Sequence, residues 1–284
     1  MDKQIILGID MGGTQVRAGL VRDGSLSSVI SERINAKGST EEVLQNLFNL
    51  SDQLINKTVT AIGIGVPGMT DSAQAIVYDA INIPSWKEVP LRQLMENRYQ
   101  LPVLINNDAN CFVLGEFYFG KGRGHNSLIG LTIGTGLGSG IIINKRLYTG
   151  KNGGAGEFGM IDYLGKYYEY YTSGQFFQNI HGINGELVFH KALEGDKEAI
   201  KMYEEMGMHL ANAIKTILYA YDVSLIILGG SVRHAFPYFS KTMWHQIQTF
   251  AYKRVIDNLK IEISELDNSG ILGAAALYYD FNEN

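Results

Sequence analysis

The sequence predicts an α/β protein in which one structural unit occurs twice, and two observations support this prediction. Short runs of aliphatic and β-branched residues alternate with segments of helical periodicity, which is the pattern of a sheet covered by helices. A strand–turn–strand pattern at residues 4–21 also returns at residues 128–143. At an offset of 124 residues the matching positions are Leu7 with Leu131, Ile9 with Ile133 and Gly12 with Gly136. A chance likeness between two glycine-rich hairpins is the alternative to a duplication.

The elements of the first half follow from local patterns. Strands are expected at residues 4–9, 16–21, 59–66 and 101–105, each followed by turn-forming or helix-capping residues. Ser39 and Glu42 have the Ser-x-x-Glu spacing of a capping box, so a helix follows with apolar residues through Leu54. Asn107 and Asp108 can cap a further helix that runs to Phe119.

The second half repeats the strands and adds longer helices. Strands are expected at residues 128–133, 140–143, 223–228 and 259–263. Asp196 can cap a long helix with one apolar face that reaches Tyr221, and the small residues of 270–279 suit a helix packed closely on another backbone. We expect a smaller N-terminal α/β domain at residues 1–107 and a larger C-terminal α/β domain at residues 108–270. A C-terminal helix at about residues 271–284 is expected to pack back on the first domain.

Composition places the chain among soluble globular proteins. Of its 284 residues 33 are glycine and 5 are proline, with 45% hydrophobic and 19% charged residues. Because the hydrophobic and charged fractions are ordinary, disorder and a collagen-like structure are excluded. The many glycines therefore belong where the backbone turns sharply or lies against a ligand.

The net charge and the single cysteine limit which binding partners and which cellular compartment are expected. A net charge of −5 and a pI of 5.7 argue against nucleic acid as the main partner. The single cysteine, Cys111, excludes an internal disulfide and a multi-cysteine zinc site, and it fits a reducing cytoplasm. Asp10 interrupts the first apolar run, and no run reaches the roughly 18 residues of a membrane span. We therefore expect neither a signal peptide nor a membrane segment.

Two glycine-rich turns are candidate phosphate sites. Asp10 ends the first strand, where a carboxylate can hold Mg²⁺ beside phosphates, directly or through water. The turn amides and the Thr14 hydroxyl can donate to phosphate oxygens. The phosphate-binding residues expected across both turns and the later glycine turn are Gly12, Gly13, Thr14, Gly134, Thr135, Gly136, Gly138, Gly229, Gly230 and Ser231. Ordinary hairpins, with an Asx-turn or bulges, are the alternative.

Carboxylates elsewhere suit a hydroxyl-bearing substrate. Asp108 follows a strand end and can accept the proton of an attacking hydroxyl in phosphoryl transfer; a helix N-cap is the alternative. Glu157 lies in a glycine-rich loop and Glu169 lies twelve residues further on. Because a carboxylate accepts several hydrogen bonds, both suit vicinal hydroxyls, with a solvated loop charge as the alternative.

Other sequence patterns do not indicate a nucleotide, metal or nucleobase site. The spacing of Gly134–Gly140 is not that of a Rossmann motif, and the near-match to a Walker A loop at residues 115–121 lacks the Ser or Thr after its lysine. The six histidines show no metal-ligand spacing, and His209 on the long helix is a packed or surface residue. The tyrosines of residues 163–171 are better explained by packing or a subunit contact than by nucleobase stacking.

In their order along the chain these motifs resemble the ROK family of sugar kinases and repressors, in the actin/hexokinase/Hsp70 superfamily. Gly8–Thr14 is similar to the first phosphate motif of that family, Ile133–Gly138 to its second, and Leu228–Ser231 to its adenosine motif. The sugar-side and catalytic segments are similar at Gly63–Gly68, Ile81–Trp86 and Asn106–Asn110, and at Glu157 and Glu169. The resemblance implies a duplicated actin-like ATPase (ribonuclease H-like) two-domain fold with an interdomain cleft.

The resemblance also implies an activity, the ATP-dependent phosphorylation of a hexose or N-acetylhexosamine. Asp108 would be the general base, and Asp10 would organise Mg²⁺. The sugar would be bound by Gly68, Asn82, Asn107, Glu157 and Glu169. A cytoplasmic homodimer is expected, with a small-molecule sugar as the substrate.

One position departs from the family pattern. Family members usually carry a zinc-ligating, sugar-contacting histidine three residues after the first glutamate, where this chain has Met160. Only eight residues separate Met160 from Glu169, none of them cysteine, so no structural zinc is expected. This departure keeps open a non-catalytic sugar sensor or partner-binding module on the same scaffold. A repressor is disfavoured because the first strand begins by Gln4, which leaves no room for a helix-turn-helix.

Overall fold

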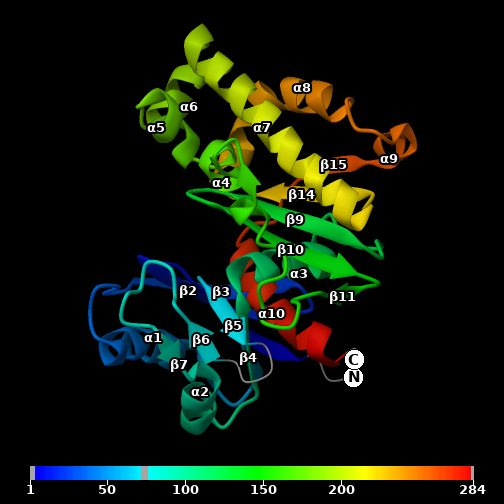
Figure 1. The fold of residues 1–284 in the computed structure, drawn as a ribbon. Helices are drawn as coiled ribbons and strands as arrows, with labels where there is room; N and C mark the ends of the chain where they lie inside the picture. Colours follow the sequence, from blue (N-terminus) through cyan, green and yellow to red (C-terminus); the bar gives the residue numbers. More distant parts are fainter. Residues whose placement is uncertain (1–3, 72–75, 283–284) are drawn as a thin grey trace. The chain divides into compact units, whose positions relative to one another are not determined.

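A computed structural model describes residues 4–71 and 76–282 (Figure 1). Its packing contacts divide the chain into two compact units. Unit 1 comprises residues 1–126, 140–155 and 265–284, and unit 2 comprises residues 127–139 and 156–264.

Unit 1 is built on a five-stranded sheet with the strand order β3-β2-β1-β4-β8. The strands are β1 (Ile5–Met11), β2 (Gln15–Arg22), β3 (Ser25–Arg33), β4 (Val59–Val66) and β8 (Val103–Asn107). The first three strands form an antiparallel meander, whereas β4 runs parallel to β1 and β8 runs parallel to β4. The carboxyl ends of β1, β4 and β8 therefore meet at one edge of the sheet.

A second five-stranded sheet has the order β11-β10-β9-β14-β15. The strands are β9 (Leu128–Ile133), β10 (Leu137–Ile143), β11 (Arg146–Leu147), β14 (Leu225–Gly229) and β15 (Lys260–Ile263). The strands β14 and β15 run parallel to β9, and β11 is antiparallel to β10. Each strand has its counterpart at the same place in the first sheet, so the repeat predicted from the offset of 124 residues is confirmed.

Helices and a small sheet complete unit 1. The Ser39 capping box is present: Ser39 N donates to Glu42 Oε2 at 2.7 Å, and Glu42 N donates to Ser39 Oγ at 3.3 Å. The remaining elements are α1 (Thr40–Leu54), β5 (Met69–Asp71), β6 (Ile76–Tyr78), β7 (Glu88–Val89), α2 (Leu91–Tyr99), α3 (Asp108–Phe119) and α10 (Ser269–Asn282). The core contains fully buried Leu7, Leu47 and Trp86.

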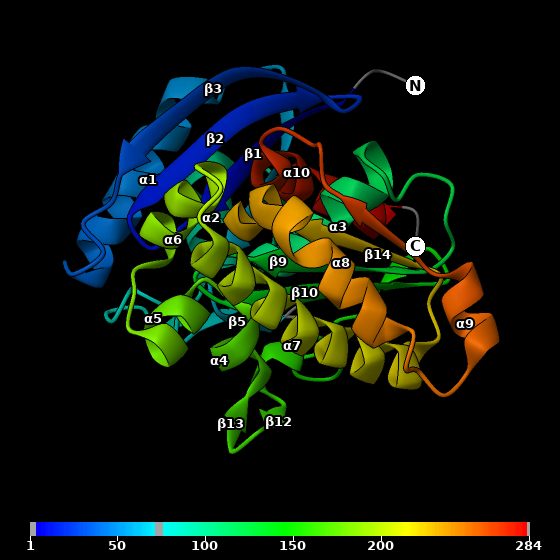
Figure 2. The same ribbon diagram turned by 90° about the horizontal axis from the view of Figure 1, so that it is seen from above.

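Unit 2 is mainly helical outside its strands. Asp196 caps α7 by accepting from Ala199 N at 2.8 Å, as predicted. The elements are η1 (Phe158–Met160), β12 (Asp162–Tyr163), β13 (Lys166–Tyr167), α4 (Tyr168–Thr172), α5 (Gln175–His181), α6 (Gly185–Leu193), α7 (Lys197–Tyr221), η2 (Ser231–Ala235), α8 (Phe236–Ile247) and α9 (Lys253–Asn258). Figures 1 and 2 show α7 and α8 running side by side.

Within unit 1, the C-terminal helix α10 lies so close to β4 and α3 that their backbones touch. A Cβ atom at Gly63 would collide with the carbonyl of Ala274, and one at Gly273 would collide with the carbonyl of Cys111. Small residues are therefore required where α10 meets β4 and α3. This requirement agrees with the close packing predicted for residues 270–279. Residues 283–284 of the predicted helix lie outside the described residues. The predicted domain boundary after Asn107 follows the repeat and stays a prediction; by packing, α3 belongs to unit 1 because it contacts α10.

Substitution of Gly63 tests this close packing. We expect Gly63→Ala to lower the free energy of unfolding by about 2–3 kcal/mol, because the new methyl group meets a backbone carbonyl that cannot rotate away. Urea denaturation measures the change. The control is Gly154→Ala, whose methyl group would make ordinary contact with the end of the flexible Met69 side chain. Equal stability of the two variants would contradict the packing argument.

Candidate functional site

In unit 1, polar residues gather where three parallel strands end. In the sheet register, Asp10 on β1 pairs with Gly65 on β4, and Gly65 pairs with Asn106 on β8. Cys111 on α3 is fully buried, and its thiol pKa is raised by burial and then by the charges of Asp108 and Asp10. Because the charges of both carboxylates raise the pKa of the same thiol, both lie near it. Asp10, the predicted magnesium residue, and Asp108, the predicted base, are therefore at the same edge of the sheet.

Asp10 is held between a cation and a helix terminus. It lies opposite Arg17 in the β1–β2 hairpin, with 3.8 Å between its Oδ2 and the arginine Nε. Its carboxylate also lies against Gly270 at the start of α10, where a Cβ atom would overlap it. Burial raises the pKa of Asp10 and Arg17 opposes that rise. The surroundings thus fix the position of a carboxylate at the turn.

The turn after Asp10 offers fewer amides than the sequence predicted. Gly12 N donates to Gln15 O at 2.9 Å within the hairpin, so this amide is already used. The backbone amides of Gly13 and Thr14 have no acceptor among the described residues. Asn82 packs against Gly13, which links the predicted sugar-side loop to the predicted phosphate turn. Gly13 and Thr14 are therefore the available donors of this turn.

Asn107 and Asp108 lie at the junction of β8 and α3. Asn107 Oδ1 caps the helix by accepting from Ala109 N at 2.8 Å, while its Nδ2 donates to Gly68 O at 3.0 Å. Asp108 is the exposed first residue of α3 and accepts from the same Ala109 amide at 2.8 Å. Asn107 therefore caps the helix, and Asp108 presents a carboxylate at its N-terminus, where the helix dipole favours negative charge; the role of Asp108 as the base stays a prediction.

In unit 2, the β9–β10 turn is held by residues 169–175, which run from α4 to the start of α5. Leu137 N donates to Glu169 Oε2 at 2.9 Å, and Gly174 N donates to Gly134 O at 2.7 Å. Gln175 Nε2 donates to Thr135 O at 2.9 Å. A Cβ atom at Gly136 would overlap the Glu169 carboxylate, so a larger residue there would displace that side chain. The predicted phosphate turn and a predicted sugar carboxylate are therefore in direct contact.

Glu157 precedes the short helix η1 and lies near Glu169. Partial desolvation of its carboxylate raises the pKa of Glu157, and the charge of Glu169 raises it further. Met160, at the end of η1, is 56% exposed and packs into no core. The position that departs from the family pattern is thus an open surface position of unit 2, close in sequence to both carboxylates.

The Gly229–Ser231 turn lies beside the β9–β10 turn. Gly229 ends β14 opposite Thr132 on β9. Gly230 has a positive φ of 77° and packs on Ile133, and Ser231 begins η2. A Cβ atom at Gly134 would lie 3.8 Å from Ser231 Oγ. The two glycine turns of unit 2 therefore form one surface, with Gly138 further along β10.

The tyrosines of residues 163–171 form a packed cluster, which agrees with packing, one of the two explanations that the sequence left open. Tyr163 stacks on Tyr168 with 4.5 Å between ring centres, and its hydroxyl lies 3.1 Å from His209 Nδ1. Asn212 Nδ2 donates to the same hydroxyl at 2.9 Å. Burial lowers the pKa of His209, so this histidine is a packed neutral residue. Within residues 4–71 and 76–282, no three His, Cys, Asp or Glu side chains form a group that could hold a metal.

The comparisons with known proteins give the family. The ROK family model matches residues 6–280. The chain belongs to the ROK family. The glucokinase of Thermotoga maritima is 27% identical over 98% of each chain, and the N-acetyl-D-glucosamine kinase of Pectobacterium atrosepticum is 30% identical over 95% of this chain and 98% of that protein. A ROK glucokinase from Streptomyces griseus, solved with glucose and AMPPNP, has a TM-score of 0.81 and 27% identity, covering 96% of this chain and 98% of that one.

Membership of the ROK family confirms the predicted fold class. The two matched sheets and the covering helices form the duplicated actin-like ATPase fold of the ROK sugar kinases. Three residues of the candidate site were missed by sequence reasoning: Arg17, Gln175 and Gly270. Arg17 could have been predicted from the sequence, because a tight turn after Met11 places it opposite Asp10. Gln175 and Gly270 act through contacts distant in sequence, which no local pattern signals.

The raised pKa of Glu157 predicts how stability depends on pH. A carboxyl whose folded pKa lies above its ordinary value of 4.5 binds more protons in the folded state, so its contribution to stability is present at low pH and is lost as pH rises through the folded pKa. Glu157→Gln is therefore expected to flatten the fall in stability above pH 4.5 in chemical denaturation. The control is Glu194→Gln at the exposed end of α6. A wild-type slope retained in Glu157→Gln would contradict the assignment.

Proposed function

We propose that this ROK-family chain uses ATP to phosphorylate a hexose or N-acetylhexosamine, with Asp108 as the general base. The observation that supports the proposal best is the arrangement in unit 1. Asp108 is presented at a helix N-terminus beside Asn107, which is bonded to the Gly68 loop, at the sheet edge that also holds Asp10. A hydroxyl acceptor, its base and a phosphate turn are the components that phosphoryl transfer requires.

In this mechanism Asp108 accepts the proton of the sugar hydroxyl as the hydroxyl oxygen attacks the γ-phosphate. The N-terminal dipole of α3 helps to keep Asp108 ionised before the transfer. Asn107 and the Gly68 loop orient the sugar, because the side-chain amide is fixed at both of its polar atoms. Most of the catalysis is positioning and electrostatic stabilisation, because the transferring phosphoryl group needs little covalent assistance.

Asp10 fits a role beside Mg²⁺. Protein sites for Mg²⁺ in phosphoryl-transfer enzymes commonly use one or two carboxylates together with substrate phosphates and water. A single carboxylate at the phosphate turn, already balanced by Arg17, matches that donor set without a cluster of acids. When bound, the ion would neutralise charge between the phosphates. Gly13 and Thr14 would donate backbone hydrogen bonds to the same phosphates.

Further sugar and nucleotide contacts are proposed in unit 2. Glu157 and Glu169 would accept hydrogen bonds from sugar hydroxyls, and the two glycine turns would hold the phosphates and the adenosine of ATP. Since Glu169 already accepts from Leu137 N with one oxygen, its other oxygen is left entirely for the sugar. Glu169 would thus couple sugar binding to the shape of the phosphate turn.

Among the residues that the structure describes, none of the helices combines the length and the apolar composition of a membrane span. We also propose that the protein is cytoplasmic and forms a homodimer.

The assignment of the base is tested by Asp108→Asn. We expect turnover to fall by about 10²–10⁴-fold, because the amide cannot accept the hydroxyl proton, while sugar affinity changes by less than about twofold. An ADP-release assay with Mg-ATP across hexoses and N-acetylhexosamines measures turnover, and calorimetry measures sugar binding. Asp79→Asn, at an exposed surface ion pair with Lys87, is the control. Full activity of Asp108→Asn would overturn the assignment. Sugar binding without turnover in the wild-type chain would favour the sensor.

The coupling through Glu169 is tested by comparing two substitutions. Glu169→Gln retains an acceptor for Leu137 N, so it should raise the KM for the sugar and leave the KM for ATP within about twofold. Glu169→Ala removes the acceptor and should raise both values, because the turn loses one of its anchors. Steady-state kinetics with each substrate varied in turn separates these outcomes. An unchanged KM for ATP in Glu169→Ala would show that the turn does not depend on this bond.

A further inference from the structure

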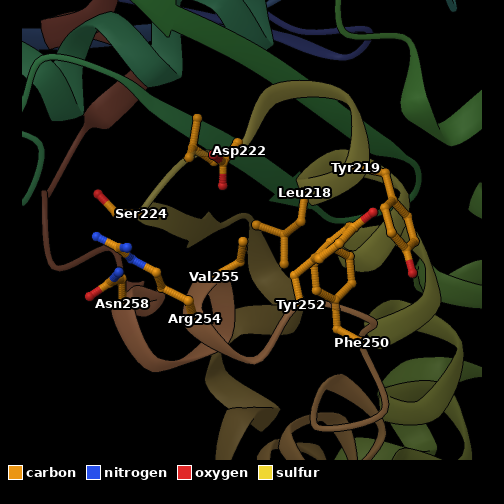
Figure 3. A pocket seen from close by; sticks show the side chains of 10 residues that line it. Leu218, Tyr219, Asp222, Ser224, Phe250, Tyr252, Arg254, Val255 and Asn258 are labelled. Atoms are coloured by element: carbon orange, nitrogen blue, oxygen red, sulfur yellow. The ribbon is translucent and has the colours of Figure 1, made fainter.

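Unit 2 contains a cavity that the proposed kinase reaction does not use. Its volume is about 580 Å³, and it lies between the end of α7, the start of β14 and the segment that joins α8 to α9 (Figure 3). This volume falls in the range of pockets that bind small molecules. Val223 and Ser224, at the amino end of β14, line the cavity, whereas the Gly229–Ser231 turn follows its carboxyl end. Since a five-residue strand spans roughly 17 Å, the cavity is separate from that turn.

One wall of the cavity is aromatic. Tyr219, Phe250 and Tyr252 stand together in Figure 3, with 4.3 Å between the ring centres of Tyr219 and Phe250. Phe250 is buried, but Tyr219 is 59% exposed and Tyr252 is 63% exposed. Leu218 and Val255 continue the apolar surface from this wall. The rings of Tyr219 and Tyr252 are thus open to solvent beside a hollow that the aromatic ring of a ligand could fill.

The remaining lining carries one cation and one anion. Arg254 and Asp222 both line the cavity away from the rings, and neither forms an ion pair with any described residue (Figure 3). The neighbouring charges are satisfied elsewhere: Lys253 pairs with Asp257 at 2.6 Å, and Lys215 donates to Thr249 Oγ1 at 3.0 Å.

Asp222 occupies a position that does not require a charge. It ends α7 in the left-handed conformation, with a φ of 47°, where glycine and asparagine are the usual residues. An aspartate here satisfies the helix terminus no better than asparagine, but it adds a negative charge to the cavity.

We propose that this cavity binds a small zwitterion with an aromatic side chain, of which an aromatic α-amino acid is the simplest example. The ligand ring would pack on Tyr219 and Tyr252, its carboxylate would bind Arg254, and its ammonium group would bind Asp222. A purely apolar ligand leaves both charges unused. A phosphorylated ligand would meet the repulsion of Asp222 and a single arginine.

The proposal is tested by calorimetry on the full chain, without sugar or nucleotide, using four probes. These are L-phenylalanine, 3-phenylpropanoate without the ammonium group, 2-phenylethylamine without the carboxylate, and glycine without the ring. We expect L-phenylalanine to bind tightest, and loss of either charged group to weaken binding by about tenfold, the size of one charge-assisted hydrogen bond. Glycine should show no binding.

Substitutions then assign each contact. Arg254→Gln should weaken L-phenylalanine and 3-phenylpropanoate by about tenfold and leave 2-phenylethylamine unchanged, whereas Asp222→Asn should do the reverse. Tyr252→Ala should weaken all three aromatic probes. Lys253→Gln and Asp257→Asn are the charge-matched controls, because this pair lies on α9 outside the cavity lining. Absence of binding by L-phenylalanine, or affinity indifferent to Arg254→Gln, would overturn the proposal.

Discussion

The close approach of α10 to the first sheet is the constraint on which unit 1 depends. Gly63 lets the backbones of β4 and α10 touch, Gly273 lets those of α10 and α3 touch, and these contacts fix where α10 begins. Its first turn places Gly270 against the carboxylate of Asp10, so the last helix of the chain positions the first carboxylate of the candidate site. Because helix and strand backbones have little freedom to shift, Asp10 is held more rigidly than a loop carboxylate would be.

A comparable role in unit 2 belongs to the segment from Glu169 to Gln175. It supplies a carboxylate, a backbone amide and a side-chain amide to one glycine-rich turn. The neighbouring tyrosine cluster packs on α7 through His209 and Asn212. Hydrogen bonds and stacked rings thus order this region of unit 2.

Local patterns in the sequence were sufficient for most of the framework. The capping residues Ser39, Asn107 and Asp196 were predicted and are confirmed, because capping depends on groups within three residues of each other. The strand β3 was not predicted, because most of its residues are exposed and it lacks an apolar face. The short helices of unit 2 were missed for a similar reason, since tertiary packing rather than internal periodicity stabilises them.

The sequence by itself determined the repeated unit, the two glycine turns and the residue types that suit a sugar and a nucleotide, because each depends on neighbours along the chain. The tertiary structure alone decided how those groups are held. It placed Gly270 against the carboxylate of Asp10 and assigned one oxygen of Glu169 to the Leu137 amide. It also created the aromatic cavity between α7 and α9. These contacts join residues far apart in sequence, and their geometry follows only from packing.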